Sequence, residues 1–484
     1  MQKFEKQLAD ILKPHQALVV VGGNWGDEGK GKIIDLVMKH YDVAVRFSGG
    51  ANAGHTVYSP GGVKIVGHLI PCGLAQDKEC VLARGEFIDI RLFLEELDKA
   101  RQDLGELPKV WLDEMSPLWT PYHALLETWL EQCRGATKVG TTGKGIGPLE
   151  GIYKLRISPT VGQLFLERGE FVGLLQTLHQ ALLPVFEKMK ERDAVLVVPS
   201  PEEAADQLLA LASRLKDVVV DTSFVLSRLM AGKKRLLFEG AQALGLDSHW
   251  GTYPFVSSGN SAAAGAAIGT GLPMQKFGAT VMVAKVLPTR VGRGPFPSEM
   301  WEREAAMKFA KENPTLFAKG ENRDKFLAAA LEKINQGKST DAEMSQYFQV
   351  LGDERGATTG RGRSVGFLDI PWLQYAVRVN GPSYLALTRF DMLSKIKTIP
   401  VVAGYEFEGK LLEPGKMPSP WQMEKIKTVR EEWPCWEEDI SGINNEKDLP
   451  KGAKDFLLKL ENLVGVPILM TGTGPGRDAI VIRG

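Results

Sequence analysis

The 484-residue sequence is poor in cysteine, contains no long apolar run and has no excess of charge of either sign. Its four cysteines, Cys72, Cys80, Cys133 and Cys435, show no CxxC or other paired spacing, so we expect no disulfide framework or zinc site and a reducing cytosol. No segment reaches the ~18 consecutive apolar residues of a membrane span. Lys and Arg number 59, as do Asp and Glu, which argues against a broad nucleic-acid-binding surface.

Apolar residues are plentiful instead, at 44% of the chain, and there are 52 glycines. This composition is typical of a globular enzyme with a large core and many tight loops. The first residues carry Glu5 and Asp10 where a secretory signal would need an uninterrupted apolar stretch. Leu8 and Leu12 share one helical face with neighbouring apolar residues, which predicts a short helical extension over residues 1–16. We therefore expect a soluble cytoplasmic protein.

Short β-branched runs alternate with helical patterns, which predicts an α/β protein with a large, mostly parallel central sheet flanked by helices. A strand at 17–21 runs into the Gly-rich segment 22–31, and a helix follows from about 32 to 39. A second strand at 43–47 ends in another Gly-rich segment. Further strands are expected at 218–221, 236–238, 280–286, 384–387 and 399–403, and peripheral helices at 161–192 and 202–214.

Residues 301–355 interrupt this rhythm, because they are polar and helical and contain no strand-like run. Asn322 is placed to cap one helix and Gly337 to end it, and residues 339–341 offer caps for a second helix. Because both helices carry apolar stripes, we expect an ordered helical insertion. Residues 17–484 are then a single α/β domain that carries this insertion.

The segment 22–32, GGNWGDEGKGK, lies between a strand and a helix, where glycines and a helix N-terminus favour phosphate. Lys30 supplies a point charge for a phosphate. The spacing is one residue too long for a Walker A loop, and Gly31 stands where Ser or Thr would hold Mg²⁺. Asp27 also lies inside this loop, where its carboxylate would repel a bound phosphate. Such a residue is expected only if it binds a metal ion or takes part in a proton transfer.

The segment 49–56, GGANAGHT, follows the second strand. His55, placed after a Gly-rich turn, can donate to a phosphate oxygen, although a lone histidine is more often a hydrogen-bonded structural residue. Ligands gather at the carboxyl ends of parallel strands, so the two Gly-rich segments together predict a nucleotide site.

WGDEGKGK followed by GGxNAGHT resembles the motif pair of the adenylosuccinate synthetase family. Further matches occur in family order at 140–148, 239–242, 251–254, 289–297 and 356–361. The resemblance implies a GTP-dependent ligase that joins L-aspartate to IMP through a 6-phosphoryl-IMP intermediate. The products are adenylosuccinate, GDP and phosphate, in AMP biosynthesis. It also implies Mg²⁺ and a homodimer.

The resemblance assigns roles residue by residue. Asp27 matches the general base and, with the Gly54 carbonyl, the Mg²⁺ ligands; His55, Lys30 and Gln242 complete the catalytic set. The residues that match the IMP site are Asn52, Asp35, Thr142, Ser257, Val291 and, from the neighbouring subunit, Arg156. Those that match the aspartate site are Thr358, Thr359, Arg361 and Arg363. Those that match the GTP site are Gly26, Glu28, Gly29, Lys30, Gly31, Lys32, Thr56, Arg389, Asp391, Gly472 and Gly474.

Several positions depart from the family pattern, and they cluster around the purine and monophosphate pocket. Arg389 stands where the family usually has Lys, Ser48 where it has Gln, and Lys144 where it has Arg. One alternative is therefore the same chemistry on another 6-oxopurine nucleotide, such as GMP or dGMP, but the branch known for it typically lacks the catalytic acid that Asp27 matches. A second alternative is a GTP-binding regulator without turnover, which would be expected to lose Asp27 or His55.

Overall fold

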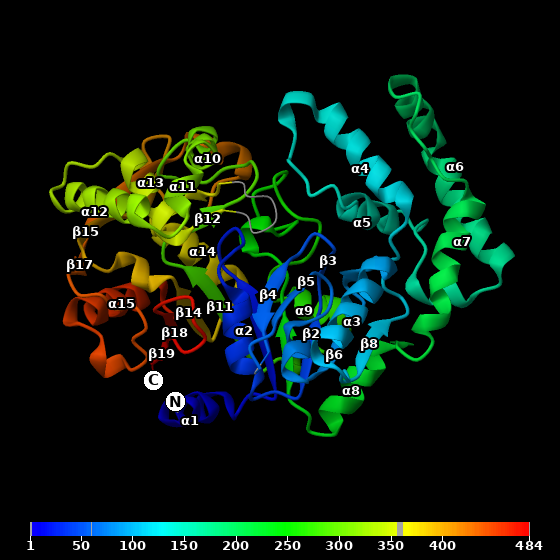
Figure 1. The fold of residues 1–484 in the computed structure, drawn as a ribbon, viewed down its shortest axis with the longest axis horizontal. Coiled ribbons are helices and arrows are strands. Elements are labelled where there is room, and N and C mark those ends of the chain that lie inside the picture. Colours follow the sequence, from blue (N-terminus) through cyan, green and yellow to red (C-terminus); the bar gives the residue numbers. More distant parts are fainter. Residues whose placement is uncertain (1, 60, 356–361, 484) are drawn as a thin grey trace.

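A ten-stranded sheet forms the centre of the computed structural model, which describes residues 2–59, 61–355 and 362–483 (Figure 1). The strand order is β19-β18-β14-β11-β1-β10-β2-β6-β8-β9, and only β19 runs antiparallel to its neighbour. The strands are β1 (Ala17–Gly22), β2 (Val43–Arg46), β6 (Glu79–Leu82), β8 (Val110–Asp113), β9 (Val219–Val220), β10 (Leu236–Glu239), β11 (Ala279–Lys285), β14 (Tyr384–Thr388), β18 (Ile468–Gly472) and β19 (Ile480–Ile482). The predicted α/β class with a mostly parallel sheet is confirmed.

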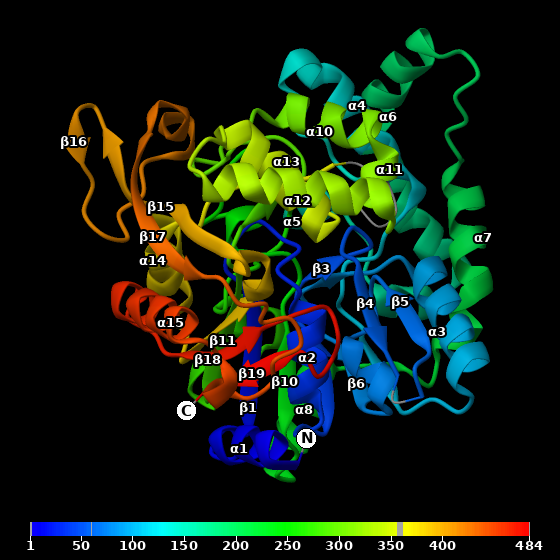
Figure 2. The ribbon, with the colours of Figure 1, turned by 60° about the vertical axis from the view of Figure 1, so that its left-hand side comes forward.

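Helices cover both faces of this sheet and extend beyond it (Figures 1 and 2). They are α1 (Gln2–Leu12), α2 (Lys30–Met38), α3 (Ile90–Leu104), α4 (Pro121–Arg134), α5 (Ile146–Lys154), α6 (Arg168–Arg192), α7 (Pro201–Ala212), α8 (Thr222–Ala231), α9 (Gly265–Thr270), α10 (Arg303–Glu312), α11 (Pro314–Phe317), α12 (Glu321–Asn335), α13 (Asp341–Gly352), α14 (Ile370–Asn380) and α15 (Lys451–Val464). Within the described ranges, none of them combines the length and apolar character that crossing a membrane requires.

Strand β1 lies between β10 and β11, so both of its edges are paired and all of its residues are buried. Val19 and Val21 belong to the hydrophobic core on one face of the sheet, whereas Leu18 and Val20 belong to the core on the other. Alternate side chains of a strand point to opposite faces, and a strand covered on both faces is apolar throughout. This explains the unbroken apolar run that predicted the strand.

Four smaller sheets decorate this framework. They are β3 (Gly49–Gly50) with β7 (Glu86–Phe87), β4 (His55–Tyr58) with β5 (Lys64–Gly67), β12 (Thr289–Arg290) with β13 (Ser364–Val365), and β15 (Ile396–Phe407) between β16 (Lys410–Leu411) and β17 (Lys427–Trp436). The strand predicted at 399–403 is the middle of β15, which runs antiparallel to both partners outside the central sheet. The last of these sheets projects from the molecule at the upper left of Figure 2.

Some local expectations differ from the structure. Asn322 does not cap α12, because the helix already begins at Glu321 and Gly320 is its N-cap. Thr340 does cap α13, through a reciprocal capping box with Glu343. The expected helix at 161–192 starts with a separate 3₁₀ turn, Val161–Phe165, and α6 begins only at Arg168. In both views α10–α13 lie above the edge of the sheet from which the β1–α2 loop emerges (Figures 1 and 2).

The short helix α9 packs closely on the sheet, as the Ala/Gly-rich composition of residues 261–272 indicates. A Cβ on Gly269 would overlap the carbonyl oxygen of Phe47, at the end of β2. Only glycine permits this approach, and it brings α9 against the strand ends that carry the second Gly-rich loop.

Candidate active site

The β1–α2 loop turns sharply at the carboxyl edge of the sheet. Gly26, Asp27 and Gly29 have φ values of +97°, 59° and 79°, a region that glycine and, less readily, Asp adopt. Glu28 is buried, and its carboxylate accepts hydrogen bonds from the Gly26 amide at 2.8 Å and from Lys30 Nζ at 2.8 Å. The loop is therefore organised from inside by Glu28, and Asp27 is left facing outward with 44% of its side chain exposed.

Two tryptophans support this loop from below. The Trp372 indole in α14 donates to the Gly23 carbonyl at 2.8 Å, and its ring stacks on Trp25 with a centroid distance of 4.0 Å. Sequence reasoning missed Trp372 because this residue lies outside every motif and is separated from Gly23 by 349 positions in the chain. No local pattern announces such a contact.

The second Gly-rich loop lies directly against the first. A Cβ on Gly31 would lie 3.3 Å from the Thr56 carbonyl oxygen, so β4 contacts the start of α2. Gly49, with φ +97°, packs against Ala241 at the end of β10 so closely that a Cβ would lie 2.5 Å from the Ala241 Cβ. The loops after β1, β2 and β10 therefore meet at one edge of the sheet, as expected for parallel strands.

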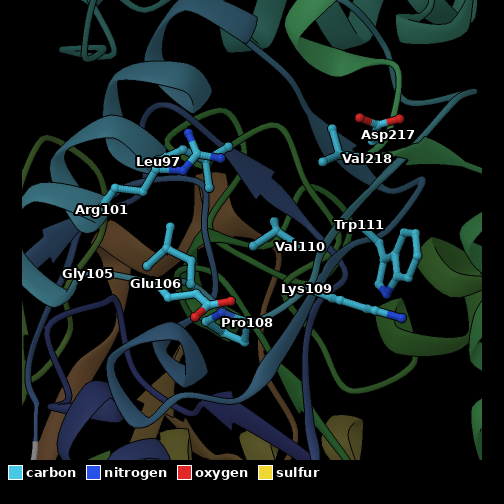
Figure 3. A pocket seen from close by; sticks show the side chains of 11 residues that line it. Leu97, Arg101, Gly105, Glu106, Pro108, Lys109, Val110, Trp111, Asp217 and Val218 are labelled. Carbon is cyan, nitrogen blue, oxygen red and sulfur yellow. The ribbon is translucent and has the colours of Figure 1, made fainter.

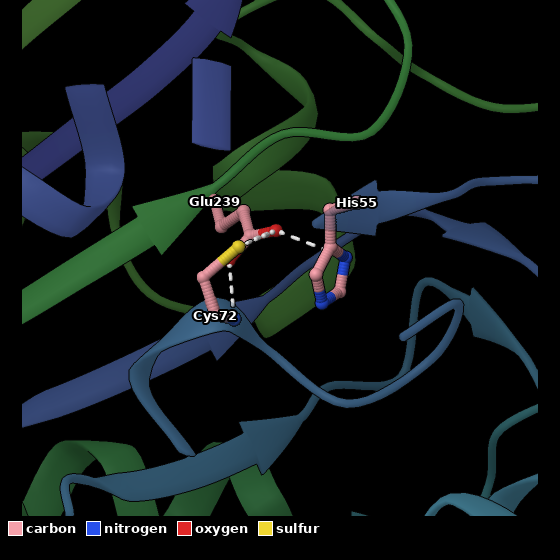
Figure 4. Close-up of side chains that lie close together, drawn as sticks. All are labelled: His55, Cys72 and Glu239. Atoms are coloured by element: carbon pink, nitrogen blue, oxygen red, sulfur yellow. Dashed lines mark hydrogen bonds and ion pairs between the residues drawn. The ribbon is translucent and has the colours of Figure 1, made fainter. Parts of the chain in front are cut away.

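His55 lies in a buried polar cluster with Cys72 and Glu239 (Figure 4). Cys72 donates to the Glu239 carboxylate from its amide at 2.9 Å and from its thiol at 3.3 Å. Arg46 Nη1 lies 3.1 Å from Glu239 Oε1 and 3.3 Å from His55 Nδ1. Although three ligand-type side chains converge here, the guanidinium already neutralises Glu239 and would repel a cation.

The contact with Arg46 favours one tautomer of His55. A guanidinium can only donate hydrogen bonds, so Nδ1 must accept and the ring proton lies on Nε2. Burial lowers the pKa of His55 to about 4, so the imidazole is neutral near pH 7. His55 is therefore a neutral imidazole, and its Nε2 atom faces β5, 2.8 Å from where a Cβ on Gly67 would stand.

Four charged side chains form a chain beside the β1–α2 loop. Asp27 Oδ2 lies 2.8 Å from Arg363 Nε, and Arg363 Nη1 lies 3.4 Å from Glu354 Oε2. Glu354 in turn pairs with Lys285 at 2.6 Å. The predicted general base and the predicted aspartate-binding arginine are thus partners in this structure. Thr358, Thr359 and Arg361 lie outside the described residues.

Buried polar atoms without hydrogen-bond partners gather at the predicted purine site. Within the described part of the chain, both amide atoms of Gln242 and the Oδ1 atom of Asn52 have no partner. Asn52 Nδ2 donates to the Ser257 hydroxyl at 3.1 Å, so two predicted IMP residues touch. Buried polar groups are normally paired, and these atoms are therefore available to a polar ligand.

The predicted guanine site also assembles from distant segments. The Thr388 hydroxyl donates to the Glu28 carbonyl at 2.7 Å, and Gly472 packs against Thr388. Lys32 donates to the carbonyl oxygens of Gly474 and Ala479, both at 2.7 Å, and burial lowers its pKa to about 8. In the described residues the buried Oδ1 atom of Asp391 has no partner, and burial raises the pKa of this carboxyl.

Other predicted residues lie apart from this cluster. Both carboxylate oxygens of Asp35 pair with Arg477, at 2.6 and 2.5 Å, and one of them also accepts from Gln76. Thr142, Val291 and Arg156 are exposed, and Arg156 has φ 67° just after α5. A single chain therefore leaves part of the predicted monophosphate site open to solvent.

A cavity of about 400 Å³ lies elsewhere, at the amino end of β8 (Figure 3). Its lining includes Leu97, Arg101, Lys109, Trp111 and Asp217. None of the predicted site residues lines it, and it lies at the edge of the sheet opposite to the Gly-rich loops.

The fold and the loops at its carboxyl edge define a nucleotide-dependent α/β enzyme. A family model described as adenylosuccinate synthetase matches residues 19–481. The adenylosuccinate synthetase of Trichlorobacter lovleyi is 37% identical over 471 residues, which is 95% of this chain and 97% of the relative. That of Mycobacterium tuberculosis is 34% identical over 469 residues, or 96% and 98% of the two chains. The chain belongs to the adenylosuccinate synthetase family.

Solved structures agree with this assignment. The fully ligated adenylosuccinate synthetase of Plasmodium falciparum superposes with a TM-score of 0.79 at 28% identity, over 96% of this chain and 99% of that one. The succinoaminodeoxyadenylate synthetase of cyanophage S-2L, bound to dGMP and dATP, has a TM-score of 0.55 at 17% identity, over 97% and 95% of the two chains, and shows the fold alone. The predicted family and enzyme class are confirmed: the activity is that of a GTP-dependent ligase joining aspartate to IMP in AMP biosynthesis.

Proposed function

We propose that Asp27 is the general base of this reaction and removes the N1 proton of the hypoxanthine ring. O6 then attacks the γ-phosphorus of GTP, the bond to GDP breaks, and a 6-phosphoryl purine forms. The aspartate amine displaces phosphate from C6 in the second step. The observation that carries the proposal is the meeting of the loops after β1, β2 and β10, which presents Asp27 at one edge together with the Gln242 amide, whose atoms have no partner among the described residues.

Phosphoryl transfer depends on positioning and on charge stabilisation. Lys30, anchored by Glu28, lies at the start of α2 and adds a fixed positive charge where the helix N-terminus already favours phosphate. We assign His55, as a neutral imidazole, to an oxygen of the transferring phosphoryl group by its match to the family. Gly26, Gly29, Gly31 and Thr56 belong to the same two loops, and we assign their backbone to the phosphates.

The Asp27 carboxylate and the Gly54 carbonyl would hold Mg²⁺. Both are hard oxygen donors of the kind that Mg²⁺ prefers, and the carboxylate is half-exposed and therefore open to a ligand. The bound ion would neutralise charge on the phosphates of GTP. In the described residues the ion pair of Asp27 is with Arg363, so a cation would compete with that guanidinium.

We assign guanine recognition to Asp391, because a carboxylate can accept from both guanine N1–H and the 2-amino group. Arg389, Gly472 and Gly474 would form the rest of this site: Gly472 packs against Thr388 and the Arg389 amide, and Lys32 donates to the Gly474 carbonyl. For the amino acid, Arg363 offers a guanidinium to a carboxylate. Thr358, Thr359 and Arg361 complete the aspartate loop by their match to the family.

The IMP site would consist of Asn52, Thr142, Ser257, Val291 and Gln242, with Asp35 nearby. Arg156 would reach the monophosphate of a neighbouring subunit in a homodimer. Its exposure, next to a 64% exposed Leu155, supports a surface that a second subunit covers.

A substrate panel tests the purine. Phosphate release is measured with IMP, GMP or dGMP as the acceptor, each with GTP, Mg²⁺ and aspartate. We expect turnover with IMP and little with the other two, because Asp27 is retained. Preference for GMP or dGMP would transfer the same chemistry to another 6-oxopurine. Absence of release with every acceptor, from a folded protein that binds GTP, would favour a regulator.

A further inference from the structure

A fully buried ion pair lies beneath the candidate active site. It joins Lys285, at the carboxyl end of β11, to Glu354, just after α13. Lys285 Nζ lies 2.6 Å from Glu354 Oε1 and donates to the Thr289 hydroxyl at 3.1 Å. Burial opposes ionisation of Glu354, but attraction to Lys285 and Arg389 outweighs it and lowers the pKa of this carboxyl. Glu354 is therefore a buried carboxylate anion.

The second oxygen of Glu354 is directed at Arg363. Glu354 Oε2 lies 3.4 Å from Arg363 Nη1, and the Arg363 amide donates to the Glu354 carbonyl at 2.9 Å. Gln349 Nε2 donates to the Arg363 carbonyl at 2.7 Å. Both the backbone and the guanidinium of Arg363 are thus held from the side of α13, while its Nε atom lies 2.8 Å from Asp27.

The pair is also attached to the β1–α2 loop. The Lys285 amide donates to Asn24 Oδ1 at 2.8 Å, and the Asn24 amide donates to Glu28 at 3.3 Å. Charges alternate from Lys285 through Glu354 and Arg363 to Asp27, and the three nearest the core are shielded from water. Each charge therefore depends on its neighbour for compensation.

A buried ion pair is not required for stability, since apolar residues of similar volume are often as stable in its place. Glu354 divides its oxygens between the buried lysine and an arginine that faces the site, which a purely structural pair would not need. We propose that Glu354 is a positioning residue that holds the Arg363 guanidinium in the orientation required to bind the amino-acid substrate.

This role rests on the proposed assignment of Arg363 to aspartate. With Nη1 held by Glu354, the other N–H groups of the Arg363 guanidinium are free to change partner. An incoming dicarboxylate replaces Asp27 as the partner of Arg363, and Asp27 is then released to act as a base. Losing Glu354 removes the contact that holds Nη1 and leaves the guanidinium oriented by Asp27, which weakens aspartate binding more than purine or GTP binding.

The test compares steady-state KM values for aspartate, IMP and GTP in purified full-length variants. Glu354→Gln keeps the shape and removes the charge, but it leaves Lys285 buried and unpaired. A second variant, Glu354→Gln with Lys285→Met, removes both charges of the pair, so that neither is left buried and uncompensated, and we expect it to fold. Glu321→Gln, in an exposed pair with Lys325, is the matched control. We expect KM for aspartate to rise at least about tenfold in both Glu354 variants, with KM for IMP and GTP changed less than about twofold.

The double variant separates positioning from structure. A positioning role predicts that its melting temperature returns toward that of the unaltered protein while KM for aspartate stays high. If KM for aspartate returns together with stability, or never changes in a folded Glu354→Gln protein, the proposal is overturned. Arg363→Leu is measured alongside: if it leaves KM for aspartate unchanged, the assignment of Arg363 fails, and with it the basis of the role of Glu354.

Discussion

Replacing Asp27 with Asn should abolish turnover and leave the fold almost unchanged. Asn keeps the shape of the side chain and tolerates the left-handed backbone conformation at φ 59°, which Ala would adopt less readily. It cannot take a proton from the purine, so kcat should fall about 10²–10⁴-fold, the usual contribution of a general base. The same change removes one carboxylate from the site proposed for Mg²⁺.

The structural cost should be small. The Asp27 side chain is 44% exposed, and its ion pair with Arg363 is screened by solvent on one side. Such half-exposed pairs contribute about 0–1 kcal/mol. The free energy of unfolding, measured by urea denaturation, should therefore change by no more than ~1 kcal/mol.

Phosphate release in the presence of IMP, GTP, Mg²⁺ and aspartate is the assay. Asp77→Asn is the control, because Asp77 is an exposed aspartate with a similar φ of 56° in a turn far along the chain from the loop. A folded Asp27→Asn protein that retained more than about a tenth of the activity would refute the role, since general-base loss costs more. A large loss of stability would instead show that Asp27 holds the loop together.

Three further outcomes are expected. Asp391→Asn should weaken GTP use and reduce discrimination against inosine triphosphate, and equal use of both by the unaltered protein would contradict the assignment. Lys32, with its pKa lowered to about 8, is charged below that pH and neutral above it, so kcat/KM for GTP should fall above about pH 8; Lys32→Arg should remove this alkaline decline. Mixing Arg156→Leu chains with Asp27→Ala chains should recover activity, at most about half per heterodimer, because one shared site then has both native residues. No recovery despite demonstrated subunit exchange would show that Arg156 serves its own chain.

Local patterns in the sequence were enough to predict the central fold. The apolar run 17–21 and the Gly-rich segment after it predict a buried strand that ends in a phosphate loop, and β1 and α2 follow that plan. The short strands β6, β8, β18 and β19 were not predicted, because runs of three to five residues are ambiguous without their neighbours. The cap of α12 was misplaced because several polar residues compete for the start of a helix.

The sequence alone determined which reactive side chains the candidate site contains. They are Asp27 inside a phosphate loop, a histidine after a second Gly-rich turn, and the residues of the motifs shared with the family. Only the tertiary structure decided which of these groups are paired with one another. The ion pair of Asp27 with Arg363, the buried Lys285–Glu354 pair and the contact of Arg46 with His55 join residues far apart in the chain. Such contacts depend on the order of strands in the sheet, because parallel neighbours bring their loops to one edge regardless of their separation in sequence.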